Sequence, residues 1–370
     1  MLKKSVRKDK RKFIDDLAKE VDAAARQHYK KTLNDTTKQL SRKFKATNHQ
    51  IRDLNGRLLT TTEEQHKRWV EHFQQLLNRP PPMEPPVLPA ANQELDISCE
   101  PLTRAEVEKA IKSLTNNKSA GPDNIPAEVL RADISTSVNM LHGLTKIWDQ
   151  EYIPSEWREG ILVKLAKKSD LSMCKNYRGI MLLSTAGKVL NRIILERMRE
   201  AVDRILRENQ AGFRPSRSTA DQITTLRIIV GQSLEWRTSL FINFIDYEKA
   251  FDSLDRNVLW DLMANSGIPS KIISLVRNTY EEANCRFLHE GGLTESFSIK
   301  SGVRQGCLLS PFLFLLAVDW IMKERTTGSG NGIQWTNLKI WILPIIWHFW
   351  HTLILRCRQK PLSLKLSHLN

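Results

Sequence analysis

The stretch NFIDYEKAFDSLDR, residues 243–256, decides how the rest of the sequence is interpreted. Its first carboxylate, Asp246, directly follows the apolar run LFINFI, which is typical of a buried strand. An Asp at a strand end serves either a turn, whose geometry Asp tolerates, or a metal ion. The second carboxylate, Asp252, is interpreted as a turn or helix-cap residue rather than a metal ligand. The stretch by itself leaves the role of Asp246 open.

The charge balance favours a polyanionic partner. The chain holds 56 Lys and Arg against 41 Asp and Glu, a net charge of +15. Much of this excess lies in residues 1–79, which contain 20 basic and 10 acidic residues. Such a concentration indicates nucleic acid ahead of an acidic membrane surface. A solvated basic face without a partner is the alternative.

Cysteine usage and hydropathy indicate an intracellular protein with no membrane role. The five cysteines are scattered and never form a CxxC pair, which favours reduced thiols and argues against a zinc site. Residues 1–12 are mostly charged, unlike a signal peptide. The apolar runs at 307–318 and 340–355 each contain a proline, and both are shorter than the roughly 20 residues of a spanning helix.

Composition divides the chain into four parts. Residues 1–79 are predicted to form a basic helical lead-in segment, and the proline-rich residues 80–99 a stiff linker. Residues 100–334 form the main domain, and residues 335–370 a tail of different composition.

The main domain mixes helices with paired strands, which predicts an α+β fold. Thr103 and Glu106 have the spacing of a capping box at the start of a helix. The other expected elements are a strand at 160–166, a long helix at 184–206, a strand at 240–245, a hairpin across Gly291–Gly292, and a polar loop running into a buried helix at 301–323.

A strand-end Asp, a basic chain and the loop Arg304-Gln305-Gly306 before a helix together suit the phosphates of a nucleotide. Two-metal phosphoryl transfer requires carboxylates that hold two Mg²⁺ ions about 4 Å apart. Turn and capping roles for the same residues remain the competing interpretation.

Five motifs then resemble one family. FIDYEKAFDSLDR and GVRQGCLLSPFLF resemble the first two palm motifs of reverse transcriptases from non-LTR (LINE-type) retrotransposons. NNKSAGPDNIPAEVL, KNYRGIMLLSTAGKVLNRII and NQAGFRPSRSTADQI resemble its finger and upstream palm motifs, in the family's order. The resemblance covers about residues 100–334. It implies a right-hand polymerase, fingers and partial palm, preceded by a helical basic segment. The implied activity is RNA-directed DNA synthesis, with an RNA template, a DNA primer, dNTPs and Mg²⁺.

The resemblance also implies roles for single residues. Asp246 would be the catalytic Mg²⁺ ligand, and the carbonyl of Tyr247 would lie beside it as a second metal ligand in the triphosphate pocket. Phe251 occupies the position of the aromatic ring that excludes a ribose 2′-hydroxyl and favours dNTPs, with ordinary packing as the alternative.

Four further positions are implied to bind the nucleotide. Gln305 and Gly306 match the loop that contacts the incoming nucleotide and the template base. Arg178 and Lys164 lie in the fingers segment that meets the triphosphate. Arg178 is the stronger assignment, because Lys164 is one of three neighbouring lysines with Lys167 and Lys168.

The third palm motif of the family, an aromatic-Ala-Asp-Asp turn, is missing where it is expected. No Asp or Glu occurs from residue 325 to 370, and four tryptophans crowd into this segment. Reading the codons of residues 339–351 one frame away permits Asp-Leu-Asp-Phe-Ala-Asp, followed by a residue that cannot be Asp. We therefore expect a frameshift between Trp335 and Lys339 and a second lesion in the motif. A novel tail is the alternative.

The sequence thus predicts a reverse transcriptase chain that is catalytically defective. The alternative is a non-catalytic nucleic-acid-binding remnant, and an unstable translation product is a third hypothesis. The family implies action in the nucleus. Nothing in the sequence indicates the oligomeric state, the element clade or the RNA that is copied.

Overall fold

The computed structural model describes three long stretches of the chain, residues 50–167, 170–238 and 249–326. It also describes the shorter pieces 14–16, 18–19, 21–23, 25–26, 240–242, 245, 247, 334–335, 338–339 and 362–363. Asp246 lies outside the described residues, as do Cys357, most of the predicted N-terminal helix and most of the tail. Of the described cysteines, Cys99, Cys174, Cys285 and Cys307 are free thiols.

The chain divides into two compact units, Met1–His49 and Gln50–Asn370. All elements below belong to the second unit. Residues 50–79, which the sequence analysis places in the lead-in segment, therefore share a unit with residues 100–334.

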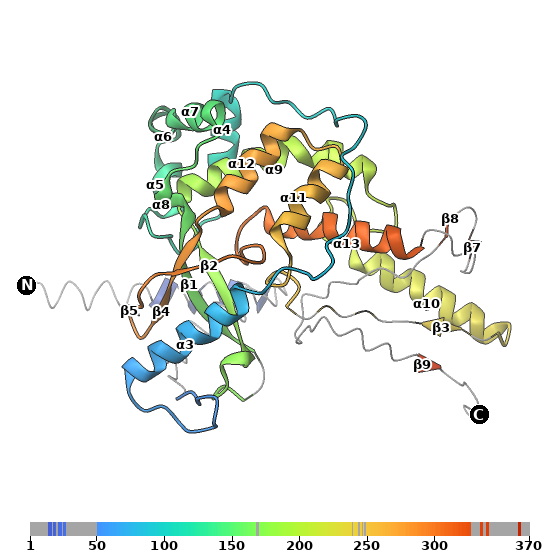
Figure 1. Ribbon diagram of the computed structural model, residues 1–370, viewed down its shortest axis with the longest axis horizontal. Helices are drawn as coiled ribbons and strands as arrows, with labels where there is room; N and C mark the ends of the chain where they lie inside the picture. Colours follow the sequence, from blue (N-terminus) through green and yellow to red (C-terminus); the bar gives the residue numbers. More distant parts are fainter. Residues whose placement is uncertain are drawn as a thin grey trace, which may run out of the picture. The chain divides into compact units, whose positions relative to one another are not determined.

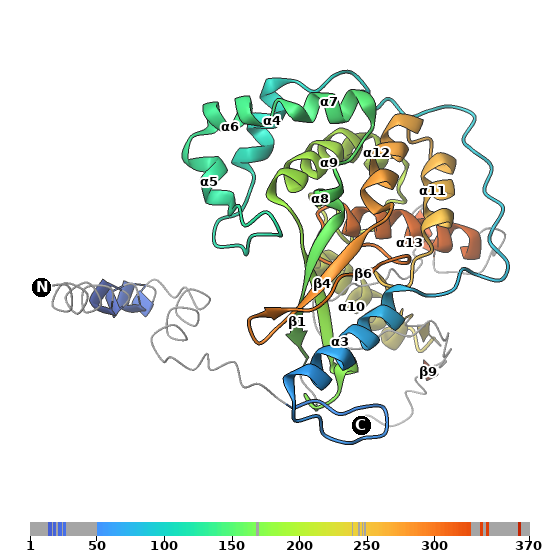
Figure 2. The ribbon, with the colours of Figure 1, turned by 60° about the vertical axis from the view of Figure 1, so that its left-hand side comes forward.

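One mixed sheet organises this part of the second unit. Strand β1 (Glu159–Ala166) pairs antiparallel with β2 (Tyr177–Leu182) and parallel with β4 (Asn284–His289). Two short strands, β5 (Gly292–Leu293) and β6 (Phe297–Ser298), pair antiparallel with β4. The turn between β4 and β5 contains Gly291 at φ 81°, as the predicted hairpin requires. Figure 2 shows β1 and β4 running side by side.

Helix α3 (Thr62–Leu77) covers one face of this sheet (Figure 2). Thr61 caps its first turn by accepting a hydrogen bond from the Glu64 amide. Trp69 and Phe73 are fully buried, and the Trp69 ring stacks on Phe287 of β4 with centroids 5.1 Å apart. The predicted apolar stripe of this helix is thus core.

A group of short helices precedes the sheet. The predicted capping box is present, because Thr103 and Glu106 bond each other's backbone amides at the start of α4. Arg197 ties this group to the next long helix through the Glu106 carboxylate, at 2.7 Å. The group consists of α4 (Arg104–Lys112), α5 (Ala127–Ala132), α6 (Ile134–Met140), α7 (Gly143–Gln150) and α8 (Ser155–Arg158).

Most of the remaining helices contribute to one continuous apolar core together with the sheet, whereas the helix at 219–235 contributes no residue to it and extends away from the sheet (Figure 1). The short helix η1 (Cys174–Asn176) leads into β2. The long helices are α9 (Thr185–Ile205), α10 (Thr219–Glu235), α11 (Arg256–Asn265), α12 (Ser270–Tyr280) and α13 (Ser310–Thr326). The α+β expectation is confirmed by this arrangement.

The predicted strand at 240–245 is described only in part. Strand β3 (Phe241–Ile242) pairs with β9 (Leu362–Ser363), and β7 (Gln334–Trp335) pairs with β8 (Leu338–Lys339). Among the described residues, no helix is long and apolar enough to cross a membrane.

Candidate functional site

Two backbone segments meet at the centre of the second unit, the turn 249–254 and the loop 299–306. The loop donates backbone hydrogen bonds to the turn, from Gly302 to the Leu254 carbonyl at 2.8 Å and from Val303 to the Phe251 carbonyl at 2.7 Å. A Cβ on Gly302 would lie 2.7 Å from the Asp252 Cα, so only glycine allows this approach. The structure therefore brings Phe251 and Asp252 beside the loop that carries Gln305.

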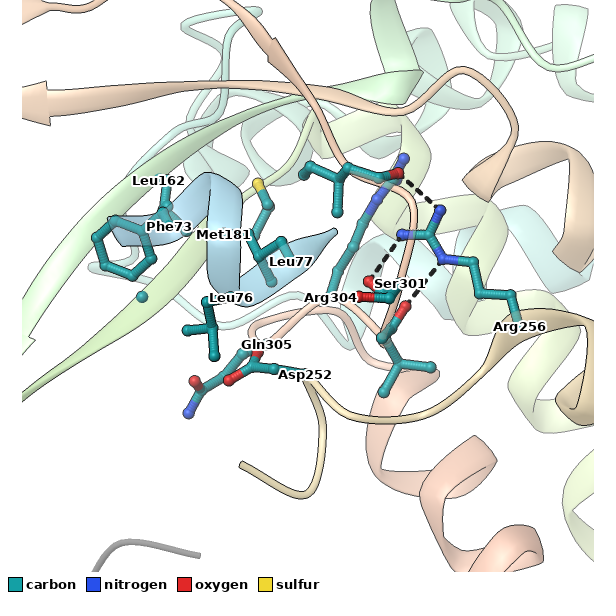
Figure 3. Close-up of a pocket in the computed structure, with 14 residues that line it drawn as sticks. Phe73, Leu76, Leu77, Leu162, Met181, Asp252, Arg256, Ser301, Arg304 and Gln305 are labelled. Atoms are coloured by element: carbon teal, nitrogen blue, oxygen red, sulfur yellow. Dashed lines mark hydrogen bonds between the residues drawn. The ribbon is translucent and has the colours of Figure 1, made fainter. Parts of the chain in front are cut away.

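Arg256, the first residue of α11, fixes this loop (Figure 3). Its guanidinium donates to the loop carbonyls of Ile299, Ser301 and Gly302 at 2.8, 3.3 and 3.0 Å. It also donates to the Tyr280 carbonyl at 3.1 Å. Because these bonds consume carbonyl groups that the irregular backbone leaves unpaired, the loop has one defined conformation.

The far end of the loop contacts β2. The Met181 amide donates to the Gln305 carbonyl at 2.7 Å. Gly306 follows at φ 115°, and a Cβ there would lie 2.5 Å from the Met181 carbonyl oxygen. Gln305 and Gly306, both predicted to contact the nucleotide, are thus fixed against the strand that carries Arg178.

A small cavity lies between these segments and α3. Figure 3 shows Asp252 and Gln305 at one side of it, with Phe73 and Leu76 of α3 opposite the loop. Its volume of about 20 Å³ holds one water molecule and no nucleotide. A nucleotide would therefore bind outside this cavity, and the cavity marks where α3, the β1–β2 hairpin and the loop converge.

Asp252 is the carboxylate at this convergence. The residue is half-buried, and no hydrogen bond to its side chain is found within the described part of the chain. Burial raises its pKa to about 6. Four cations from separate segments oppose that rise: Lys249, Arg79, Lys167 and Arg178.

This charge arrangement suits an anionic ligand. Lys249 lies in the turn, Arg79 two residues past α3, Lys167 directly after β1, and Arg178 near the start of β2. Positive charge held on ordered elements attracts phosphate groups. Arg178 is the neighbour in β2 of Gly179, which lines the cavity, and its role towards a nucleotide stays a prediction.

Lys164 lies on the other face of the β1–β2 hairpin. In the strand register Lys164 pairs with Gly179 and Leu165 with Arg178, and neighbouring pairs point to opposite faces. The Lys164 amine lies 2.8 Å from His289 Nδ1 and 5.1 Å from the centre of the Trp69 ring. Burial lowers its pKa.

Lys167 and α3 supply charge that the sequence analysis did not assign to the site. The Lys167 side chain is buried, and its charge acts on both Asp252 and His72. Burial lowers the pKa of His72 to about 4, assisted by Lys249, Arg68 and Lys167. The alternation of faces along β1 was the available signal for preferring one lysine over another.

Aromatic rings flank the turn. Phe251 is half-buried and stacks on Phe314 of α13, with centroids 5.1 Å apart and planes at 29°. Tyr247 meets the same Phe314 ring edge-on at 6.3 Å. Asp255, rather than Asp252, caps α11 by accepting from the Val258 amide.

The described residues do not form a divalent-metal site. No group of three or more His, Cys, Asp or Glu side chains converges among them. Asp246 lies outside the described residues, and Asp252 is surrounded by cations that compete with a metal ion.

Residues 165–334 match the protein family described as reverse transcriptase (RNA-dependent DNA polymerase). The matched segment contains β2, the turn 249–254 and the loop 299–306. The fold is accordingly that of a right-hand polymerase.

Three similar proteins come from mobile elements. The transposon TX1 uncharacterized 149 kDa protein of Xenopus laevis is 28% identical over 232 residues, covering 62% of this chain and 18% of that protein. The Pol polyprotein from type-1 retrotransposable element R2 of Popillia japonica is 25% identical, covering 63% and 32%. The RNA-directed DNA polymerase from mobile element jockey of Drosophila funebris is 25% identical, covering 65% and 26%. The chain spans less than a third of each relative.

Solved structures show weaker likeness. A partial Cas6-RT-Cas1–Cas2 complex has a TM-score of 0.35 at 14% identity, covering 64% of this chain and 36% of that one. Apo telomerase from Candida tropicalis, truncated from its C-terminal domain, has a TM-score of 0.31 at 16% identity, covering 54% and 45%.

Residues 165–334 therefore form a reverse transcriptase domain by this match, and the chain is similar to proteins of non-LTR retrotransposons.

Proposed function

We propose that this chain binds an RNA template, a DNA primer and an incoming dNTP in the manner of an RNA-directed DNA polymerase. The observation that carries the proposal is the backbone contact between the turn that holds Phe251 and the loop that holds Gln305 and Gly306. Four cations add positive charge that acts on Asp252 in the same turn. The match of residues 165–334 to reverse transcriptases supports a nucleotide as the ligand.

The cations would bind the triphosphate. Arg178, Lys167 and Lys249 extend from three different segments, so that a triphosphate between them would be held at several oxygens. The Gln305 side chain would hydrogen-bond the nucleotide, because its carbonyl is fixed to Met181 and its side chain is only half-buried. The Phe251 ring would lie against the sugar, where a 2′-hydroxyl meets it.

Reverse transcriptases generally use a divalent metal ion. In this chain Asp246 and the carbonyl of Tyr247 would be its ligands, as the resemblance implies. The ion would supply positive charge to the triphosphate oxygens. One carboxylate is insufficient for two such ions, and residues 325–370 add no acidic side chain. We therefore expect substrate binding with little or no primer extension.

Nucleotide binding tests the proposal through charge-removing variants. The affinity of Mg²⁺-dNTP for the chain on a primed RNA template would be measured for Arg178→Ala, Lys167→Ala and Lys164→Ala. The first two are expected to weaken binding about tenfold or more, because each removes a charge-assisted bond. Lys164→Ala should leave the affinity unchanged and lower thermal stability, since its amine contacts His289 and Trp69.

Arg204→Ala is the matched control, since Arg204 is exposed on α9 and pairs with Glu200. Equal loss of affinity in all four variants would indicate non-specific attraction and contradict the proposed site. Primer extension by the wild-type chain that Asp246→Ala abolishes would contradict the expected catalytic defect while supporting the assignment of Asp246.

A further inference from the structure

Phe213 has an unusual conformation on an exposed loop. It lies in the loop between α9 and α10, 45% exposed, with a backbone φ of 57°. A bulky side chain rarely adopts the left-handed region, because its Cβ crowds the neighbouring carbonyl. Such a conformation persists only where surrounding contacts impose it, and it points to a function for the residue.

Arg214, the next residue, imposes the conformation. Its guanidinium is buried and bonds the Asp203 carboxylate at 2.6 Å. The same group donates to the carbonyls of Asp203, Arg207 and Gln210 at 3.1, 2.8 and 3.0 Å. These bonds anchor the loop to the end of α9 and thereby fix the backbone position of Phe213.

The anchored ring of Phe213 meets Phe251. Their centroids are 6.4 Å apart with planes at 79°, an edge-to-face contact. Phe251 also stacks on Phe314, which is buried in α13 with Val318 and Met322. Phe251 therefore contacts one ring in the core and a second ring supplied by a different loop.

Among the described residues, Phe213 and Phe314 provide the aromatic rings in contact with Phe251. Phe213 borders an open cavity lined by Leu206, Leu308 and Pro311. If the Phe213 ring were removed, the space would join this cavity, and Phe251 would be free to turn into it.

We propose that Phe213 is a positioning residue that holds the Phe251 ring against the sugar and thereby sets the preference for dNTPs over rNTPs. The inference rests on the proposed nucleotide site and extends it to the loop between α9 and α10, outside the turn 249–254. Phe213 acts through Phe251 and makes no contact of its own with the nucleotide. The dNTP:rNTP affinity ratio, rather than overall affinity, is the quantity it controls.

Equilibrium binding tests this without requiring catalysis. Mg²⁺-dATP and Mg²⁺-ATP would be titrated against the full chain on a primed RNA template that calls for adenine. The variants are Phe213→Leu, Phe213→Tyr, Phe251→Ala and the double variant Phe213→Leu/Phe251→Ala. Ile228→Ala on α10 is the matched control, because its side chain is similarly exposed, at 47%.

We expect Phe213→Leu to lower the dATP:ATP ratio about three- to tenfold, the range of one aromatic contact. Phe213→Tyr and Ile228→Ala should keep the wild-type ratio. In the double variant, loss of Phe213 should add nothing to the effect of Phe251→Ala, since Phe213 acts through that ring.

Three results would contradict the inference in different ways. A normal ratio in Phe213→Leu, with Phe251→Ala still abolishing selectivity, would remove the role of Phe213 and leave the proposed function standing. Equal binding of dATP and ATP by the wild-type chain, or no binding of either, would overturn the proposed role of Phe251 and the inference with it. Additive effects in the double variant would show that Phe213 acts on the nucleotide independently.

Discussion

At the scale of single residues, Gly306 determines how closely the loop 299–306 approaches strand β2. Its φ of 115° is open only to glycine, and a Cβ would meet the Met181 carbonyl at 2.5 Å. Gly306→Ala must therefore displace either the loop or β2. We expect lower stability and weaker dNTP binding, measured by chemical denaturation and nucleotide titration.

The variant Gly291→Ala separates two causes of the lost stability, the strained backbone conformation and the steric contact with Met181. Gly291 also has a positive φ, 81°, but a Cβ there meets nothing within 4 Å. This variant should be less stable by only the cost of the left-handed backbone conformation, about 1–2 kcal/mol, and should bind nucleotide normally. If both variants lose equal stability and bind equally well, the contact with Met181 is not what requires glycine at 306.

The structural role of a residue could be predicted from the sequence where its partners lie close to it in the chain. Thr103 and Glu106 form the predicted capping box because both partners lie within one turn. The contact between Phe213 and Phe251 joins two loops that are separated by α10 and β3, so no local pattern indicates it. The environment of Lys164 depends on His289, which follows it by 125 residues.

At the scale of elements, the junction of α3 with the sheet predicts a pH dependence. His289 accepts from the Lys164 amine at Nδ1 and donates from Nε2 to Gln65 of α3 at 2.8 Å. Burial lowers its pKa to about 4, assisted by Lys164 and opposed by Glu290. At a pH between 6.5 and 4, His289 is therefore protonated in the unfolded chain and neutral in the folded chain.

Stability should accordingly fall as pH drops from 6.5 towards 4. Between pH 7.5 and 5.0 the His289 contribution is about 2 kcal/mol. His72 acts in the same direction, whereas Asp252, whose pKa is raised to about 6, acts in the opposite direction. The free energy of unfolding should be measured by denaturation at pH 7.5 and pH 5.0. Its change between these pH values should be about 2 kcal/mol smaller in His289→Gln than in the wild-type chain. An unchanged difference would rule out His289 as a source.

The same junction makes α3 part of the folded unit rather than a separable leader. Trp69 and Phe73 are each worth about 3–5 kcal/mol when buried, and together they approach the whole stability of a domain. A chain lacking residues 1–49 should keep its cooperative unfolding transition. A chain lacking residues 1–79 should not fold. Equal unfolding transitions in the two truncated chains would contradict the place of α3 in the core.

The position of this boundary could not be read from composition. The proline-rich residues 80–99 resemble a linker, yet Leu95 bonds the Gly267 carbonyl at 2.6 Å and Ala91 bonds that of Ala264. Burial of Trp69 against Phe287 depends on partners more than 200 residues away in sequence. The helix itself was predictable from its periodicity, whereas its partner was not.

At the scale of the whole molecule, the order of motifs predicted the family, and the fold brings two of them into contact. The turn that holds Phe251 bonds the loop that holds Gln305, whereas Lys164 and Arg178 lie on opposite faces of their hairpin. The roles of these residues towards a nucleotide stay predictions. The assignment of Asp246 stays a prediction, because this residue lies outside the described part of the chain.

Templated nucleotide binding is the measurement that tests the central claim most directly. The chain would be assembled with Mg²⁺, an RNA template and a DNA primer ending in a dideoxynucleotide, so that no bond can form. The account predicts that the complementary dNTP slows dissociation of this complex about tenfold relative to a mismatched dNTP, and that Arg178→Ala removes the difference. Equal dissociation with either dNTP would mean that the chain does not read a template, and would contradict its assignment as the substrate-binding part of a reverse transcriptase.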